Sequence, residues 1–244
     1  MKEKNVAVVL SAGQGKRMHS KMAKQYLMIE GMPVIWYSLQ AFEECPFIDE
    51  VILVAGEADM AYCREQIVEK YGFRKVRRIV AGGKERYHSV YNGLLAIQED
   101  CSYVYIHDGA RPFLTQEILE RAREAVLIHQ ACVVGMPVKD TIKICDEAGF
   151  GIQTPDRSAL WQVQTPQVFS YSLIRGSYEL LMEALQKGME GTVTDDAMVV
   201  ERMTDCKVKL VEGSYSNIKI TTPEDLAVAG SLVLLLRAEK NRKK

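Results

Sequence analysis

Residues 5–26 read NVAVVLSAGQGKRMHSKMAKQY, and we expect this stretch to decide the fold. Its apolar run at residues 6–10 is rich in β-branched side chains, which is typical of a buried parallel strand. Gly13 and Gly15 then allow a tight turn and a close approach of the backbone to a ligand. Free backbone N–H groups, with the basic side chains at residues 16–24, would attract a polyphosphate. A strand-to-helix turn with solvated lysines is the alternative that these residues leave open.

The composition is that of an ordinary globular protein, with 48% hydrophobic and 26% charged residues among 244. A formal net charge of −1 argues against nucleic-acid binding, which needs a basic face. No apolar run approaches the roughly 20 residues that span a bilayer, and the residues before the first strand lack a signal peptide's apolar core. The six cysteines and four histidines match no zinc spacing. We therefore expect a cytoplasmic protein with reduced thiols that binds neither nucleic acid nor membrane.

Short apolar runs alternate with helix-like segments along most of the chain. We expect further strands at residues 50–55, 76–81, 103–107, 132–138 and 207–211. We expect helices at residues 33–42, 58–71, 85–98, 171–186 and 195–203, and after the capping residues Thr115 and Thr222. Strands that alternate with helices imply an α/β fold with a doubly wound, parallel sheet. No repeat or linker divides the chain, so residues 1–244 are predicted to form a single domain.

Residues 139–164 break this alternation. Two short β-like pieces, TIKIC at 141–145 and GFGIQ at 149–153, are joined by DEAG, which suits a hairpin turn. A two-stranded ribbon alone is barely stable in water, so it needs a surface to pack on. We therefore predict a projecting β-arm whose packing surface is a second subunit, giving a homodimer.

Polar clusters follow three of the predicted strands, at residues 11–17, 82–89 and 107–111. Ligands of open α/β sheets bind at the carboxyl ends of the strands, so these clusters predict a nucleotide site. Two familiar phosphate motifs are excluded. Met18 occupies the third glycine position of the dinucleotide fingerprint, and Glu85 follows Gly83-Lys84 where a P-loop requires Ser or Thr.

Asp108 is the candidate metal ligand, because it ends a predicted strand beside Gly109. Mg²⁺ usually binds through one or two carboxylates plus substrate phosphates, so one aspartate is enough. A second anion site is predicted from arginine and threonine side chains that suit phosphate oxygens, together with one lysine. Its members are Arg111, Thr141, Arg157, Thr165, Thr194 and Lys219.

Several other residues have simpler structural interpretations. His107 is interpreted as a packed strand residue rather than a base. Asp195 and Asp196 suit a helix N-terminus, where the dipole favours carboxylates, better than a pair of catalytic acids. Trp161 and Tyr178 are interpreted as core residues.

Seven stretches, taken together, resemble the 2-C-methyl-D-erythritol 4-phosphate cytidylyltransferase family of the non-mevalonate isoprenoid pathway. They are SAGQGKRM with AKQY, GGKERYHSV with NGL, HDGARPF, PVKDTIK, DRSALWQVQTPQVF, TDDA and EGSYSNIKITTPEDL. The resemblance covers nearly the whole chain. It implies a Rossmann-like domain with a β-arm that clasps a second subunit. It also implies that CTP and a sugar-alcohol phosphate react, with Mg²⁺, to give a CDP-alcohol and pyrophosphate.

The resemblance also implies roles for individual residues. Arg17 and Lys24 would bind the triphosphate and stabilise the charge at the α-phosphorus, and Asp108 would hold Mg²⁺. The cytosine and ribose pocket would be lined by Ala12, Gly13, Gly83, Lys84 and Ser89. The acceptor phosphate would be held by Arg111, Thr165, Thr194 and Lys219. Thr141 and Arg157, on the arm, would be lent to the site of the neighbouring subunit.

Three positions depart from the family pattern, and three rival functions remain. The family usually has proline at Ala23, alanine at Ser11 and often an acidic residue at Ser216. Ribitol-5-phosphate cytidylyltransferase, a teichoic-acid enzyme, resembles the chain through HDGARPF, QTPQ and NIKITTP. An NAD-dependent dehydrogenase is disfavoured by the failed fingerprint. A nucleotide sensor without catalysis would be expected to lack Lys24 or Asp108.

Overall fold

Strand β1 (Asn5–Ser11) lies inside the central sheet and is buried on both faces. The side chains of Ala7 and Val9 pack into one hydrophobic cluster, and those of Val6 and Val8 pack into another on the opposite face. An apolar run without polar alternation is what such a doubly covered strand requires. The computed structural model describes residues 3–13, 18, 22–98 and 100–242, with only the backbone described for 237 and 239–242.

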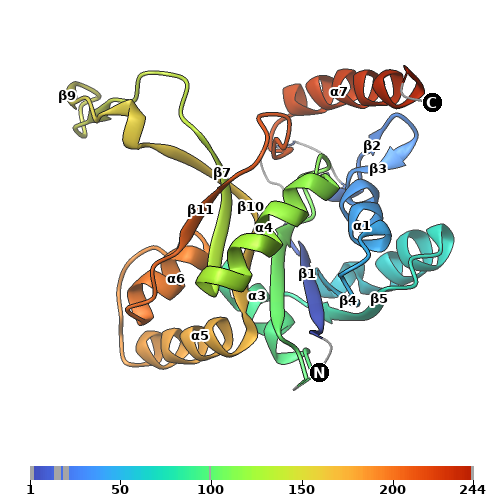
Figure 1. Ribbon diagram of the computed structural model, residues 1–244, viewed down its shortest axis with the longest axis horizontal. Helices are drawn as coiled ribbons and strands as arrows, with labels where there is room; N and C mark the ends of the chain where they lie inside the picture. The colour runs from blue at the N-terminus through green and yellow to red at the C-terminus, as the bar shows by residue number, and fades with distance from the viewer. Residues whose placement is uncertain (1–2, 14–17, 19–21, 99, 243–244) are drawn as a thin grey trace.

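The sheet has seven strands in the order β11-β7-β10-β6-β1-β4-β5. Besides β1 it contains β4 (Glu50–Ala55), β5 (Val76–Ala81), β6 (Tyr103–Asp108), β7 (Ala131–Pro137), β10 (Trp161–Ser170) and β11 (Lys209–Glu212). Strands β4 and β6 flank β1 in parallel register, β5 pairs parallel with β4, and β11 pairs parallel with β7. The predicted α/β fold with a mostly parallel sheet is confirmed (Figure 1).

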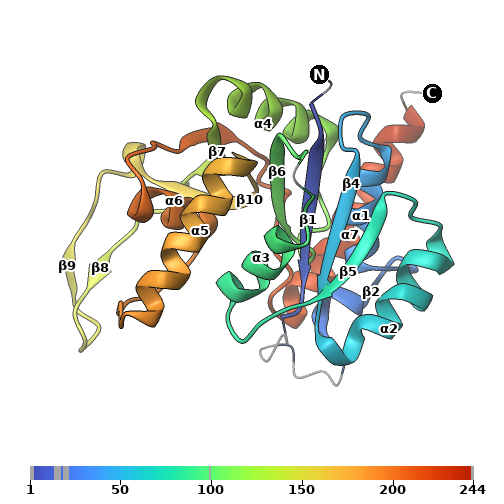
Figure 2. The same cartoon turned by 90° about the horizontal axis from the view of Figure 1, so that it is seen from below.

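Helices cover both faces of the sheet (Figure 2). One face is covered by α1 (Val34–Glu44), α4 (Gln116–His129) and the segment formed by η3 (Glu57–Asp59), α2 (Met60–Tyr62) and the π-helical η4 (Cys63–Glu69). The other face is covered by α3 (Arg86–Leu95), α5 (Tyr171–Gln186) and α6 (Asp196–Met203). In α4 the predicted cap is present, since the Thr115 hydroxyl accepts from the Ile118 N–H.

The last helix, α7 (Pro223–Arg242), packs beside the small sheet of β2 (Met28–Ile29) and β3 (Met32–Pro33). A third hydrophobic cluster joins these elements and includes Ile29, Ile220 and Val233. At the start of α7 the Asp225 carboxylate accepts from the N–H groups of Thr221 and Thr222, which is the reverse half of a capping box. Within the described ranges, no helix combines the length and the apolarity needed to cross a bilayer.

Strand β10 is the main feature that the sequence did not predict. It pairs antiparallel with both β6 and β7, and its first residues fall within the range predicted for the arm. Its sequence, WQVQTPQVFS, is not a continuous apolar run, and Pro166 lies where the register with β7 shifts between Val163 and Gln167. A proline and a bulge both weaken the pattern of a central strand, so periodicity did not reveal it.

The predicted β-like pieces of the arm form an isolated two-stranded sheet of β8 (Ile144–Cys145) and β9 (Gly151–Gln153). The Asp146 carboxylate closes the turn by accepting from the N–H groups of Ala148 and Phe150. The ribbon extends away from the central sheet (Figures 1 and 2). Its apolar side chains face solvent, with Phe150 72% and Ile152 66% exposed.

Candidate active site

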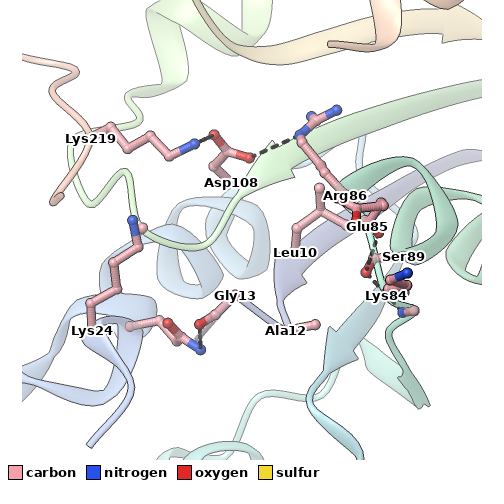
Figure 3. Close-up of a pocket in the computed structure, with 13 residues that line it drawn as sticks. Leu10, Ala12, Gly13, Lys24, Lys84, Glu85, Arg86, Ser89, Asp108 and Lys219 are labelled. Carbon is pink, nitrogen blue, oxygen red and sulfur yellow. Dashed lines mark hydrogen bonds and ion pairs between the residues drawn. The ribbon is translucent and has the colours of Figure 1, made fainter. Parts of the chain in front are cut away.

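A cavity of about 710 Å³ lies at the carboxyl ends of β1 and β6 (Figure 3). Each of the three predicted strand-end clusters contributes to its wall. The lining residues are Leu10, Ala12, Gly13, Lys24, Gln25, Gly83, Lys84, Glu85, Arg86, Ser89, Asp108, Ala110 and Lys219. Lys24 and Asp108 therefore share one cavity, as the proposed chemistry requires. Arg17 was also predicted for this site, but it lies outside the described residues.

The wall after β5 is a tight glycine turn. A Cβ on Gly82 would collide with Ala12 Cβ, and a Cβ on Gly83 would collide with His88 Cβ. The Ser89 hydroxyl accepts from the Gly83 N–H at 3.0 Å, which ties the turn to the first turn of α3. Glycine is therefore needed here because the Cβ atoms of Ala12 and His88 already occupy the space that a side chain at either position would take.

The 3-10 turn η2 (Lys24–Tyr26) brings Lys24 to the cavity. The other two residues of the turn, Gln25 and Tyr26, anchor it. The Gln25 amide donates to the carbonyl oxygens of Ser11 and Gly13. The buried Tyr26 hydroxyl contacts Ser11 Oγ at 2.9 Å and Cys63 Sγ at 3.0 Å. Burial, with the Cys63 thiol nearby, raises the pKa of Tyr26, so the phenol stays a neutral hydrogen-bonding group. Side-chain bonds thus fix the turn that carries Lys24 to the end of β1.

Asp108 ends β6 and is surrounded by three cations. Its Oδ2 lies 2.7 Å from Lys219 Nζ and 3.8 Å from Arg111 Nε, and its Oδ1 lies 3.7 Å from Arg86 Nε. Burial alone would raise the pKa of Asp108, but Lys219, Arg86 and Arg111 outweigh it and hold that pKa well below its usual range. The carboxylate is therefore ionised at neutral pH and forms the electrostatic centre of the cavity.

The donor set around Asp108 fits a divalent ion that is held mainly by substrate phosphates. Within the described part of the chain, no group of three or more His, Cys, Asp or Glu side chains is placed to hold a metal. Asp108 presents an ionised carboxylate to the cavity, and its Oδ1 lies 3.7 Å from Arg86 Nε, farther than the 2.7 Å between Oδ2 and Lys219 Nζ. One carboxylate plus phosphate oxygens is a usual Mg²⁺ environment.

Lys219 is held in place through the buried segment before it. Asn217 is fully buried, and its amide donates to the Thr165 carbonyl at 2.9 Å. The Arg111 guanidinium donates to the Asn217 carbonyl at 2.8 Å. Arg111 therefore contacts both Asp108 and the segment that carries Lys219. Arg111 and Lys219, two of the six predicted anion-binding residues, thus lie beside Asp108.

Thr165 supports Asp108 from behind instead of lining the cavity. Its side chain is 3% exposed, and its hydroxyl accepts from the Asp108 N–H at 3.1 Å and contacts His107 Nδ1 at 3.0 Å. His107 is fully buried, and burial lowers its pKa to about 4, so the ring is neutral at pH 7. The interpretation of His107 as a packed residue is confirmed.

We expect Thr165→Val to lower the melting temperature by roughly 3–10 °C, because it leaves the buried Asp108 N–H and His107 Nδ1 without their partner. Thr194→Val is the matched control for stability. Thr194 is exposed, and its hydroxyl makes a long contact of 3.7 Å with Met198 Sδ. Thermal unfolding followed by circular dichroism measures both. Equal melting temperatures for the two variants would contradict the supporting role of Thr165.

A family model described as 2-C-methyl-D-erythritol 4-phosphate cytidylyltransferase matches residues 5–234. The chain belongs to this family. Relatives with this name include one from Lachnospira eligens, 53% identical over 93% of this chain and 97% of the relative. Another, from Caldanaerobacter subterraneus subsp. tengcongensis, is 50% identical over 91% of this chain and 96% of its own.

Solved structures give the same result. A 4-diphosphocytidyl-2C-methyl-D-erythritol synthase from Anaerococcus prevotii superposes with a TM-score of 0.83 at 34% identity, covering 96% of this chain and 97% of its own. The 2-C-methyl-D-erythritol 4-phosphate cytidylyltransferase from Thermus thermophilus has a TM-score of 0.73 at 30% identity, covering 93% and 97%. The fold is therefore that of a family of nucleotidyltransferases.

Two of the departures from the family pattern are accommodated by the structure. Ala23 has φ −62° and ψ 140°, which a proline ring also permits, so this turn keeps a proline-compatible backbone without the ring. Ser11 contacts the Tyr26 hydroxyl, so its hydroxyl joins the buried network behind Lys24. Ser216 donates its N–H to Ser214 Oγ at 3.1 Å and is not among the residues that line the cavity.

Three predicted residues lie away from the cavity of their own chain. Thr141 is exposed on the arm. Arg157 begins the 3-10 turn η5 (Arg157–Ala159), and its guanidinium donates to the Lys139 carbonyl at 2.7 Å. Thr194 precedes α6 and does not line the cavity.

Sequence reasoning missed Arg86, which lines the cavity and faces Asp108. It also interpreted both Asp195 and Asp196 as helix-start residues. Asp195 does cap α6, since its carboxylate accepts from the Met198 N–H at 2.9 Å. Asp196 is the first residue of α6, as interpreted, and it is in addition fully buried and paired with Arg86. The sequence signalled this pair only through a basic residue, Arg86, shortly after the Gly82-Gly83 turn and through the doubled aspartate at 195–196.

Proposed function

We propose that this chain transfers the cytidylyl group of CTP to 2-C-methyl-D-erythritol 4-phosphate, giving 4-diphosphocytidyl-2-C-methyl-D-erythritol and pyrophosphate. The observation that carries the proposal is that Lys24, Asp108 and Lys219 line one cavity with the glycine turn, in a chain of this family. A sensor without catalysis is expected to lack Lys24 or Asp108, and both residues line this cavity. Family membership also argues against a dehydrogenase.

The chemistry requires positioning and charge neutralisation. An acceptor phosphate oxygen is already anionic near pH 7, so it attacks the α-phosphorus without a general base. A bond forms between this oxygen and the α-phosphorus, while the bond from the α-phosphorus to the oxygen bridging to the β-phosphate breaks. The electron pair leaves with pyrophosphate. Lys24 and Arg17 stabilise the added charge, and holding the two anions in line supplies much of the rate.

The remaining roles follow the cavity wall. Ala12, Gly13, Gly83, Lys84 and Ser89 hold the cytosine and ribose. Arg111 and Lys219 bind the acceptor phosphate beside Asp108, with Thr165 acting through its contact with the Asp108 N–H. Thr194, just before α6, is proposed as a further contact of the acceptor, although it does not line the cavity of the single chain. Asp108 would hold Mg²⁺, which supplies charge neutralisation on the phosphates when bound.

The working enzyme is proposed to be a homodimer in which Thr141 and Arg157 complete the partner's site. Exposed apolar side chains on the arm support this, because an isolated ribbon needs a surface to pack on. The use of CTP, a nucleotide of the cell interior, supports a cytoplasmic location.

We expect pyrophosphate release from CTP and Mg²⁺ when 2-C-methyl-D-erythritol 4-phosphate is added, and release at least tenfold slower with ribitol 5-phosphate at equal concentration. A coupled phosphate assay follows both reactions, and mass spectrometry identifies the CDP-alcohol. A reaction without acceptor controls for CTP hydrolysis. Faster release with ribitol 5-phosphate would assign the chain to the rival substrate, and no release with either would refute the transfer.

A further inference from the structure

The guanidinium of Arg86 is clamped from outside the cavity by a buried carboxylate. Arg86 Nη1 donates to Asp196 Oδ1 at 2.9 Å, and Nη2 donates to Asp196 Oδ2 at 2.7 Å. This two-pronged bond is the strongest and most directional ion-pair geometry in proteins. The Arg86 side chain is 27% exposed at the cavity, whereas that of Asp196 is fully buried. Only the arginine can therefore meet a ligand.

The clamp is itself held by two further buried side chains. The Tyr178 hydroxyl, fully buried on α5, donates to Asp196 Oδ1 at 2.6 Å. Burial, with Asp196 adjacent, raises the pKa of Tyr178 and keeps this donor protonated. The Gln167 amide oxygen on β10 accepts from the N–H groups of Asp196 and Ala197, both at 2.9 Å. Elements α3, α5, α6 and β10 thus converge to fix one guanidinium.

Stability alone does not explain this arrangement. Burying a carboxylate costs free energy, and the attraction to its ion-pair partner does little more than offset that cost. A well-packed apolar pair would often stabilise the fold equally well. The clamp uses two of the five N–H groups of Arg86 and leaves Nε on the side of Asp108, at 3.7 Å from Oδ1. A long side chain that would otherwise lose rotamer freedom on meeting a ligand is already ordered before binding.

We infer that Asp196 is a positioning residue that fixes the Arg86 guanidinium beside Asp108 for contact with the phosphates of the bound nucleotide. The inference rests on the proposed function for the identity of the nucleotide. Arg86 is thereby one of the nucleotide-binding residues. Asp196 lies outside the cavity and affects nucleotide binding only by holding Arg86 in place.

A double-mutant cycle on CTP affinity tests the inference. Asp196→Asn, Arg86→Met and the double variant are titrated with CTP in MgCl₂ by calorimetry, using the full chain. We expect each single variant to bind CTP on the order of tenfold more weakly. The double variant should lie within about twofold of the weaker single variant, because Asp196 has nothing to hold once the guanidinium is gone. Additive losses, or wild-type affinity for Asp196→Asn, would overturn the inference.

Steady-state kinetics supply a second readout. If Asp196 acts through Arg86, both single variants should change the same parameter, KM or kcat, in the same proportion. A purely structural role would lower the melting temperature of Asp196→Asn without moving either constant, which would also overturn the inference. The binding cycle does not depend on turnover, so failure of catalysis in the wild-type chain would count against the proposed function and leave the cycle readable.

Two further variants guard the result. Tyr178→Phe removes only the hydroxyl behind Asp196, so if Asp196→Asn does not fold, this variant should show a smaller loss of CTP affinity, about threefold. Unchanged affinity in a folded Tyr178→Phe would then refute the clamp. Glu179→Gln is the matched control. It breaks the exposed Arg175–Glu179 pair on the same helix, 2.7 Å between Nε and Oε1, and should leave CTP affinity unchanged.

Discussion

Lys24→Ala is expected to lower kcat on the order of 10²-fold or more, by comparison with the loss of one preorganised charge donor in other enzymes. The lysine lines the same cavity as Asp108 and is carried on a turn that side-chain bonds tie to β1. Charge on the transferred group and its leaving oxygens is greatest in the transition state, so a fixed cation contributes more there than in the ground state. The loss should therefore appear in kcat as well as in kcat/KM.

The measurement is pyrophosphate release at saturating CTP and acceptor, with the melting temperature recorded for each variant. Lys187→Ala is the matched control, because Lys187 follows α5 and its ammonium pairs with Glu183 at 3.8 Å on the surface. That variant should keep wild-type kcat. A folded Lys24→Ala enzyme that turns over at the wild-type rate would remove Lys24 from the mechanism and leave the charge stabilisation to other groups.

The parallel part of the fold was predictable because doubly buried strands leave a strong sequence pattern. Strands β4 and β5 have the predicted bounds, and the turn that follows β5 carries residues that line the cavity. Strand β10 was not predictable in the same way. Its polar residues Gln164 and Gln167 are buried and bonded to distant segments, to the Ser214 carbonyl and to the start of α6. Polar residues that are satisfied by tertiary contacts look like loop residues in a single sequence.

The candidate site shows the same division. Residues at strand ends were found because topology alone brings strand ends together. Arg86 and Asp196 were missed because they are 110 positions apart, and their pairing depends on how the tertiary fold brings the start of α6 to the start of α3. The two aspartates of the TDDA stretch have different partners: Asp195 caps α6, and Asp196 is a buried ion-pair partner of Arg86. Helix-terminus rules predict the first and have no means of predicting the second.

The arm leads us to expect that each active site of the dimer is formed by residues of both subunits. Arg157→Ala and Lys24→Ala chains are each expected to be nearly inactive as pure dimers. If Arg157 acts in the partner's cavity, a mixed dimer has one site with both residues intact and one site with neither. A fully exchanged equal mixture contains about half mixed dimers, so roughly a quarter of wild-type activity should return. If Arg157 acts in its own chain, every site in the mixture stays defective.

The geometry of one chain favours the shared arrangement. Arg157 is bonded to the Lys139 carbonyl on the projecting arm and does not line the cavity of its own chain, while Phe150 and Ile152 on that arm are 72% and 66% exposed. Differently tagged chains, exchanged by mild dissociation and recovered by tandem affinity steps, show whether mixed dimers form. Lys24→Ala mixed with the Lys24→Ala/Arg157→Ala double variant is the matched control, because no dimer in that mixture has an intact site. Purified mixed dimers without restored activity would refute sharing through Arg157, since catalysis would then depend on Arg157 within its own chain.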